Sequence, residues 1–211
     1  MLDLSRITLV AIDNTSRVNA TIKAVYTCLS YAKFGSVKLI TSKEIKEQYQ
    51  DSLLKDGILV EEMVFPITNI DEYSRYCLYE LYKHVDKEYC LMVHDHAFII
   101  NPAAWSDDFY NYDYIGAPCR TTDGIQYSEE QIGGGGFTLR SKRLIEYTKT
   151  IDYDNKTNED TIITVRKRDE IVSLGMKICP HNIARKFVVQ NPLDDNHTIE
   201  TSFGFHSRVI H

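Results

Sequence analysis

The sequence has no pair of cysteines at a metal-binding or redox spacing. Its five cysteines are an odd number, and no two of them are separated by only two residues. A zinc site built from cysteines and a framework of disulfides are therefore both unexpected. Reduced thiols in a reducing compartment fit this pattern, so we expect the protein to be cytoplasmic.

Long apolar runs and an excess of positive charge are also absent. No run approaches about 18 apolar residues, and the N-terminus shows no basic segment followed by an apolar stretch, so neither a transmembrane helix nor a signal peptide is expected. The net charge is −6, which disfavours a broad phosphate-binding surface and therefore nucleic acid as a partner. One basic run, at residues 166–168, is either a solvated helix face or a local basic site.

The chain has 211 residues, of which 43% are hydrophobic, and this length fits one compact domain better than two. The first hundred residues alternate between strand and helix patterns. Nearly continuous apolar runs predict strands at residues 7–12 and 89–93, and shorter ones at 37–40 and 58–65. Helical patterns separate them, at residues 18–34, at 43–54 and from Asp71 onward. This order predicts an α/β fold with a mostly parallel sheet flanked by helices.

We expect the first helix to be capped by residues 14–16 and ended by Gly35.

The second half of the chain shows shorter patterns. After residue 93, residues 97–100 continue the extended chain, 112–116 form a short strand, and the polar stretch 120–132 forms a loop. Residues 137–139 are a further strand, Ser141 caps a helix, and residues 158–174 are a helix.

The first candidate site is His94-Asp95-His96, directly after the predicted strand at 89–93. Ligands of open α/β sheets bind beyond the carboxyl ends of the strands. Two histidines two positions apart point to the same face of a strand and could share a metal, whereas Asp95 points to the other face unless the strand has ended. The alternative is that these are ordinary polar residues at a strand–loop junction. Asp13 ends the first strand in a similar way.

The second candidate is the run of four glycines, Gly133–Gly136. Such a run either lets the backbone approach a ligand closely or is simply a flexible loop. A dinucleotide-binding fingerprint needs a helix directly after the glycines, and here a strand-like Phe137-Thr138-Leu139 follows. A Rossmann-type cofactor site is therefore excluded.

Two further patterns carry ionisable groups. The acids of Asn158-Glu159-Asp160 stand at a helix start, where they either complement the helix dipole or supply a general base. His206, in Phe203-Gly204-Phe205-His206, is either a satisfied core histidine or a site residue. The sequence leaves both choices open.

Taken together, residues 89–141 resemble a family of glycosyltransferase-like domains whose substrates are mostly unassigned. The resemblance is carried by YDYIGAP at residues 112–118 and GGFTLRS at 135–141, with Asn101-Pro102 and Trp105 between the strand and these motifs. It extends loosely to residues 158–160 and 203–206. The chain departs from the family pattern because His94 stands where Trp is usual, His96 stands where Gly or a second acid is usual, and no Asp-x-Asp is present.

The resemblance implies a GT-A-like, nucleotide-diphospho-sugar transferase fold over the single domain 1–211. Its nucleotide-binding half would span about residues 1–100 and its acceptor half about 101–211. It implies a glycosyltransferase that moves a hexose or pentose from a nucleotide-sugar donor to a hydroxyl acceptor. That acceptor would be a glycan or, less favoured, a modified DNA base.

The resemblance also implies roles for particular residues. Asp95 would contact the donor ribose and a divalent cation, Mn²⁺ or Mg²⁺, and His206 would complete the metal site. Asp160, next to Glu159, would be the catalytic base, which favours inversion. The donor would be bordered by Gly135 and Gly136, with a looser contact from Arg75. From position alone we add His96 to the metal ligands, and Asp13 and Gly134 to the donor site.

Two other functions fit the same residues. A glycoside hydrolase also uses two carboxylates but needs no nucleotide. A non-catalytic module of the same fold would bind a nucleotide or carbohydrate and turn nothing over.

Overall fold

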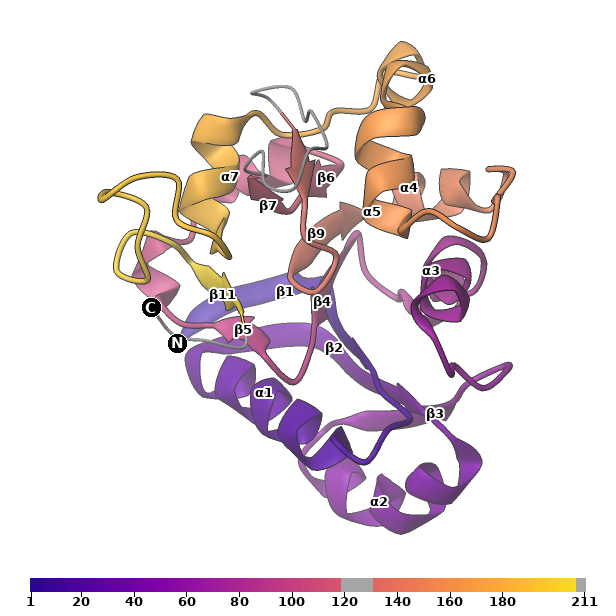
Figure 1. Cartoon of the computed structure of the whole chain (residues 1–211). Helices are drawn as coiled ribbons and strands as arrows, with labels where there is room; N and C mark the ends of the chain where they lie inside the picture. The colour runs from indigo at the N-terminus through magenta and orange to yellow at the C-terminus, as the bar shows by residue number, and fades with distance from the viewer. Residues whose placement is uncertain (119–130, 208–211) are drawn as a thin grey trace.

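A twisted six-stranded sheet forms the centre of the computed structural model, which describes residues 1–118 and 131–207 (Figure 1). Most of the loop predicted over residues 120–132 therefore lies outside the described residues. The strand order is β3-β2-β1-β4-β9-β6, and the first four strands in this order are parallel, whereas β9 is antiparallel to both of its neighbours. These strands are β1 (Leu2–Ile12), β2 (Ala32–Thr41), β3 (Leu59–Glu62), β4 (Tyr89–Val93), β6 (Tyr114–Ile115) and β9 (Thr138–Ser141). The mostly parallel α/β sheet predicted from the sequence is confirmed.

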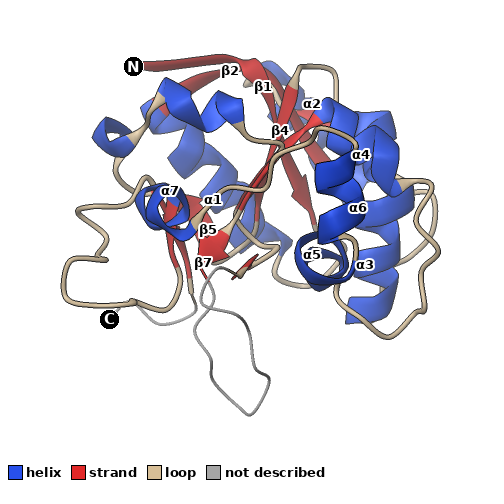
Figure 2. Ribbon diagram, turned by 90° about the horizontal axis from the view of Figure 1, so that it is seen from above, coloured by secondary structure: helices blue, strands red, loops and turns tan. Residues whose placement is uncertain are grey.

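Helices cover both faces of this sheet (Figure 2). Helix α1 (Val18–Tyr31) packs on one face and α3 (Ile70–Tyr79) on the other. Alternate residues of β1 divide between the two cores: Leu9 packs toward α1, and Val10 packs toward α3. Burial on both faces explains why the strand is a continuous apolar run rather than an alternating one. The remaining helices are α2 (Lys43–Lys55), α4 (Lys142–Thr148), α5 (Glu159–Thr161), α6 (Arg168–Ser173) and α7 (His181–Phe187).

A second, three-stranded sheet brings the C-terminal segment to the end of β4. It consists of β5 (Ala97–Ile99), β11 (Gly204–His206) and β10 (Val188–Val189), and β5 is antiparallel to β11. The register places Ala97 opposite His206. A two-stranded ribbon, β7 (Ala117–Pro118) and β8 (Ile132–Gly133), leads into the remaining glycines.

Two local predictions are wrong. Helix α1 ends at Tyr31, and Gly35 lies inside β2, where a Cβ atom would come within 2.0 Å of the Ser5 carbonyl oxygen; the glycine permits close strand pairing and does not end the helix. The cap predicted at residues 14–16 is also absent, because Arg17 precedes the helix without a side-chain cap. After β4 the chain reverses, and His94 pairs with Ala97 across a tight turn, so the extended segment predicted at residues 97–100 forms a separate strand, β5.

The helix predicted over residues 158–174 is interrupted. Between α5 and α6 the backbone forms a π-helical turn at Ile162–Arg166, and Lys167 leaves the helical conformation with φ −107°. In the basic run, Arg166 pairs with Asp154 and Lys167 with Glu170. None of the helices in the described part of the chain is long and apolar enough to cross a membrane.

Candidate functional site

A cleft of about 770 Å³ opens at the carboxyl ends of β1 and β4. Four other segments complete its walls: the residues before α3, the glycine run, the start of α5 and the end of β11. All of the site residues predicted from the sequence line this cleft except Arg75; they are Asp13, Asp95, His96, Gly134, Gly135, Gly136, Glu159, Asp160 and His206. The topology of the two sheets thus gathers groups that are far apart in the sequence.

The side chain of Arg75 lies elsewhere. It is exposed, and its guanidinium carbon lies 5.4 Å from the ring centre of Phe65. Tyr73, two positions earlier on α3, faces the cleft instead. Two residues along a helix differ by about 200° in direction, so only one of this pair can reach the cleft.

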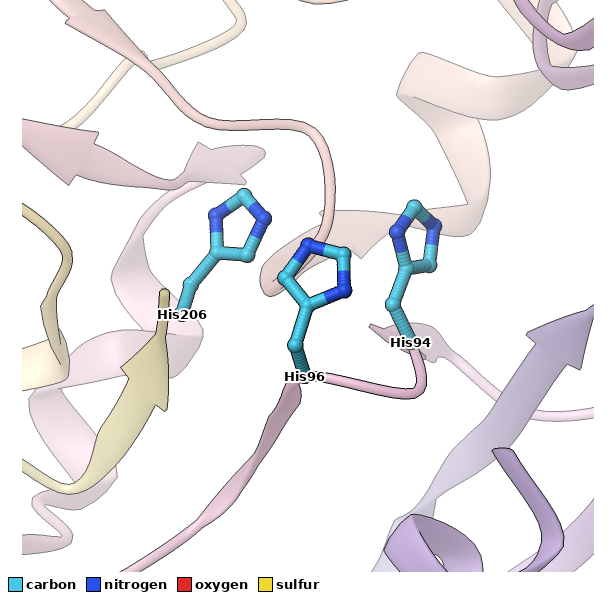
Figure 3. Close-up of side chains that lie close together, drawn as sticks. All are labelled: His94, His96 and His206. Atoms are coloured by element: carbon cyan, nitrogen blue, oxygen red, sulfur yellow. The ribbon is translucent and has the colours of Figure 1, made fainter. Parts of the chain in front are cut away.

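Three imidazole rings meet at one end of the cleft (Figure 3). His94 and His96 come from the turn after β4, and His206 comes from β11 through its pairing with β5. One nitrogen from each ring can be chosen so that the three lie within 4.8 Å of one another. From the sequence we expected Asp95, His96 and His206 as metal ligands, and we noted that His94 and His96 could share a metal.

Neighbouring side chains orient two of these rings. The Nε2 atom of His94 lies 2.5 Å from the hydroxyl of Tyr73, and the Nδ1 atom of His96 is hydrogen-bonded to Asp95. The ring of His206 stacks on that of His96, and the two ring centres are 5.2 Å apart. Its Nδ1 atom is buried and has no hydrogen-bond partner among the described residues.

Burial keeps two of the rings neutral. It lowers the pKa of His94 to about 4 and that of His206 to about 3, and the charge of the neighbouring imidazoles adds to both shifts. At neutral pH these rings therefore carry free lone pairs, as metal ligation requires.

Asp95 has a different position from the one expected. One carboxylate oxygen accepts the hydrogen bond from His96, and the other lies 3.1 Å from a guanidinium nitrogen of Arg17. Burial alone would raise the pKa of Asp95, but the hydrogen bond from His96 and the charges of His96 and Arg17 outweigh it and hold the pKa below its ordinary value. Asp95 therefore holds the Nδ1 side of the His96 ring, and its oxygens do not belong to the cluster of three ring nitrogens.

The carboxylate of Asp160 is anchored by the glycine run. Its Oδ2 atom accepts hydrogen bonds from the backbone nitrogens of Gly134 at 2.8 Å and Gly135 at 3.2 Å. Gly134 adopts a φ of +75°, which favours glycine. Burial, reinforced by the charge of Glu159, raises the pKa of Asp160. The side chain borders the cleft, and its position is fixed by backbone groups.

Glu159, the neighbouring acid, is buried and contacts a different set of groups. It is 2% exposed, and its Oε1 atom accepts a hydrogen bond of 2.9 Å from Arg140, which is 1% exposed. Ser74 donates a further hydrogen bond to the other oxygen, at 3.2 Å. The carboxylate of Glu159 therefore neutralises the buried charge of Arg140, whereas that of Asp160 contacts backbone nitrogens of the glycine run.

Asp13 organises the edge of the cleft at the end of β1. Its carboxylate accepts hydrogen bonds from the backbone nitrogen of Thr15 at 2.8 Å and from the hydroxyl of Thr21 at 2.5 Å. The side chain therefore fixes the loop into α1. Arg17, which follows this loop, is the only lysine or arginine among the described residues that line the cleft.

The family described as "Protein of unknown function (DUF5672)" matches residues 59–206. The structure is similar to that of a glycosyltransferase involved in the glycosylation of the major capsid of PBCV-1, with a TM-score of 0.57 and 11% identity over 95% of this chain and 91% of that chain. It is also similar to the galactosyltransferase LgtC in complex with donor and acceptor sugar analogues. The TM-score is 0.51, and the identity is 11% over 96% of this chain and 87% of that chain. No curated protein matches the sequence. The fold is therefore of the GT-A type.

Proposed function

The chain belongs to the family of proteins of unknown function DUF5672, and we propose that it is a glycosyltransferase that moves a sugar from a nucleotide-sugar donor to a hydroxyl acceptor. The observation that carries the proposal is the anchored carboxylate of Asp160 in a cleft at the carboxyl ends of β1 and β4. Ligands of open α/β sheets bind at this edge. The GT-A-type fold, shared with two glycosyltransferases, supports the same class of function.

The donor would lie across the end of β1 and against the glycine run. Asp13 and the neighbouring polar groups would meet the ribose, and the guanidinium of Arg17, which also lines the cleft, would meet the diphosphate. Gly135 and Gly136 line the cleft and would border the donor sugar. A Cβ atom at Gly136 would lie 2.3 Å from Nε2 of His206, so the site has no room for a side chain there.

Asp160 would take the proton of the acceptor hydroxyl as this hydroxyl attacks the anomeric carbon. The raised pKa of Asp160 makes its carboxylate a stronger base. Negative charge builds on the departing diphosphate, where Arg17 would stabilise it. A divalent cation held by the histidines would supply further stabilisation of this charge. A base in this position favours inversion at the anomeric carbon.

The acceptor would enter from the C-terminal half. A second cleft of about 500 Å³ shares Gln190 with the first, and it is lined by the exposed acids Asp194, Asp195 and Glu200. Carboxylates accept hydrogen bonds from sugar hydroxyls and repel phosphates. This chemistry favours a glycan acceptor over a base in DNA.

The test compares wild-type protein with Asp160→Asn, and with Asp152→Asn as a control at an exposed position nearby. Each protein is incubated with a panel of nucleotide sugars and glycan acceptors, and release of the nucleoside diphosphate is measured. We expect Asp160→Asn to be slower by about 10²–10⁴-fold and the control to match wild type. Transfer at the wild-type rate by Asp160→Asn would remove the base role. Cleavage of glycosides without a nucleotide would indicate a hydrolase, and donor binding without turnover would indicate a non-catalytic module.

A further inference from the structure

The three histidines offer one kind of donor atom only. GT-A-type chemistry led us to expect Mn²⁺ or Mg²⁺ at Asp95, but Asp95 contacts His96 and Arg17, and among the described residues the clustered ligand atoms are those of the three histidines. Mg²⁺ and Mn²⁺ favour carboxylate, carbonyl and water oxygens, whereas imidazole nitrogens suit Zn²⁺, Co²⁺, Ni²⁺ and their neighbours. The donor set therefore does not match the ion that the fold suggests.

The surroundings of the rings match those of metal-binding histidines. Such histidines typically use their second nitrogen to hydrogen-bond a carboxylate or another polar group, which fixes the ring. His96 does this with Asp95, and His94 does it with Tyr73. The nitrogens left without these bonds are Nδ1 of His94 and Nε2 of His96. Figure 3 shows one nitrogen of each ring turned toward the other rings.

The third ring, that of His206, fits into the site because Gly136 has no side chain. His206 reaches the group because β11 pairs with β5, and its Nε2 atom occupies the space that a Cβ atom at Gly136 would fill. A polar ring packed into a partly buried site is costly when it lacks partners. The nitrogen of His206 that faces the other two rings is Nε2 (Figure 3), and an ion shared among the three rings would bind there.

We propose that His94, His96 and His206 form a binding site for a nitrogen-preferring divalent transition-metal ion, of which Zn²⁺ is the representative, and that the site discriminates against Mg²⁺. Three protein ligands leave further coordination positions for a molecule in the cleft, as in catalytic zinc sites. The proposal rests on the proposed function only for the task of the ion, which would be to meet the donor diphosphate. The binding itself is independent of sugar transfer.

The test is metal binding by the whole chain, purified without a histidine tag and stripped with chelator. Binding of Co²⁺ is followed by its visible absorption, and binding of Zn²⁺ by calorimetry and by displacement of Co²⁺. We expect one ion per chain, a Co²⁺ spectrum typical of nitrogen ligation, and no displacement by excess Mg²⁺. Absence of binding by both Co²⁺ and Zn²⁺, or equal competition by Mg²⁺, would overturn the proposal.

Variants separate this site from adventitious binding. His206→Ala should abolish Co²⁺ absorption, and Asp95→Asn, which keeps all three ligands, should weaken Zn²⁺ binding by about 10–100-fold. His181→Ala is the matched control, because His181 contacts the backbone of Gln131 outside the cleft. Each variant is first checked for cooperative thermal unfolding. Binding that survives His206→Ala would overturn the site. Metal binding without any nucleotide turnover would refute only the proposed function, and turnover without metal binding would refute only this inference.

Discussion

Replacing Glu159 by Gln should destabilise the protein by about 3–5 kcal/mol. The side chains of Arg140 and Glu159 are 1% and 3% exposed and form a buried ion pair at 2.9 Å. Gln preserves the size of the side chain but removes its charge, which leaves the guanidinium buried without a counter-ion. Breaking a buried pair from one side costs about 3–5 kcal/mol. For a chain of this length each kcal/mol corresponds to about 2–4 °C, so the expected fall in Tm is about 6–20 °C.

The measurement is thermal and urea unfolding followed by far-UV circular dichroism. Glu62→Gln is the control, because Glu62 is exposed at the end of β3 and its replacement should change stability by no more than about 0.5 kcal/mol. Asp160→Asn should lose much less stability than Glu159→Gln and should lose transfer instead. If Glu159→Gln unfolds within about 2 °C of wild type and is inactive, the two acids have been assigned in the wrong order.

Three further outcomes follow from the described contacts. Asp113→Asn should cost about 1.5–3 kcal/mol in urea unfolding, because the buried carboxylate accepts hydrogen bonds from Ser141 and the backbone of Lys177 and pairs with Arg143. Burial alone would raise the pKa of Asp113, but these bonds outweigh it and lower the pKa. The stabilisation is therefore present above about pH 4 and is lost as the pH falls through the lowered pKa, so the unfolding free energies of wild type and Asp113→Asn should converge in acid. A difference that stays constant down to about pH 2 would contradict this account. Gly136→Ala should displace the ring of His206 and weaken Zn²⁺ binding in calorimetry while the protein stays folded; unchanged affinity would refute the packing argument.

The central strands could be predicted from the sequence because burial on both faces gives them continuous apolar runs. Strand β4 has the predicted bounds, and β1 extends the predicted run toward the N-terminus. The position of a polar residue just after such a strand was then enough to place Asp13 and Asp95 at the cleft. The general rule about strand ends thus located most of the candidate site.

The finer geometry depends on contacts that local patterns do not encode. The approach of His206 to His94 depends on the register between β5 and β11, which are distant in the sequence. The choice of Tyr73 over Arg75 is set by the rotation of α3 against the sheet. The different partners of Glu159 and Asp160 depend on the buried charge of Arg140. A signal for His94 was present in the sequence, since it lies two positions before His96.

The most direct test of the central claim is nucleotide binding by the purified chain. Thermal shift is measured with a panel of nucleoside diphosphates and nucleotide sugars, each with added metal and with chelator. A ligand at about 100 times its dissociation constant adds about 2.7 kcal/mol, or about 5–11 °C for a chain of this length. We predict a shift of this size for the diphosphate and the nucleotide sugars of one base. A folded protein that shifts with none of them would contradict the assignment of the cleft to a nucleotide-sugar donor.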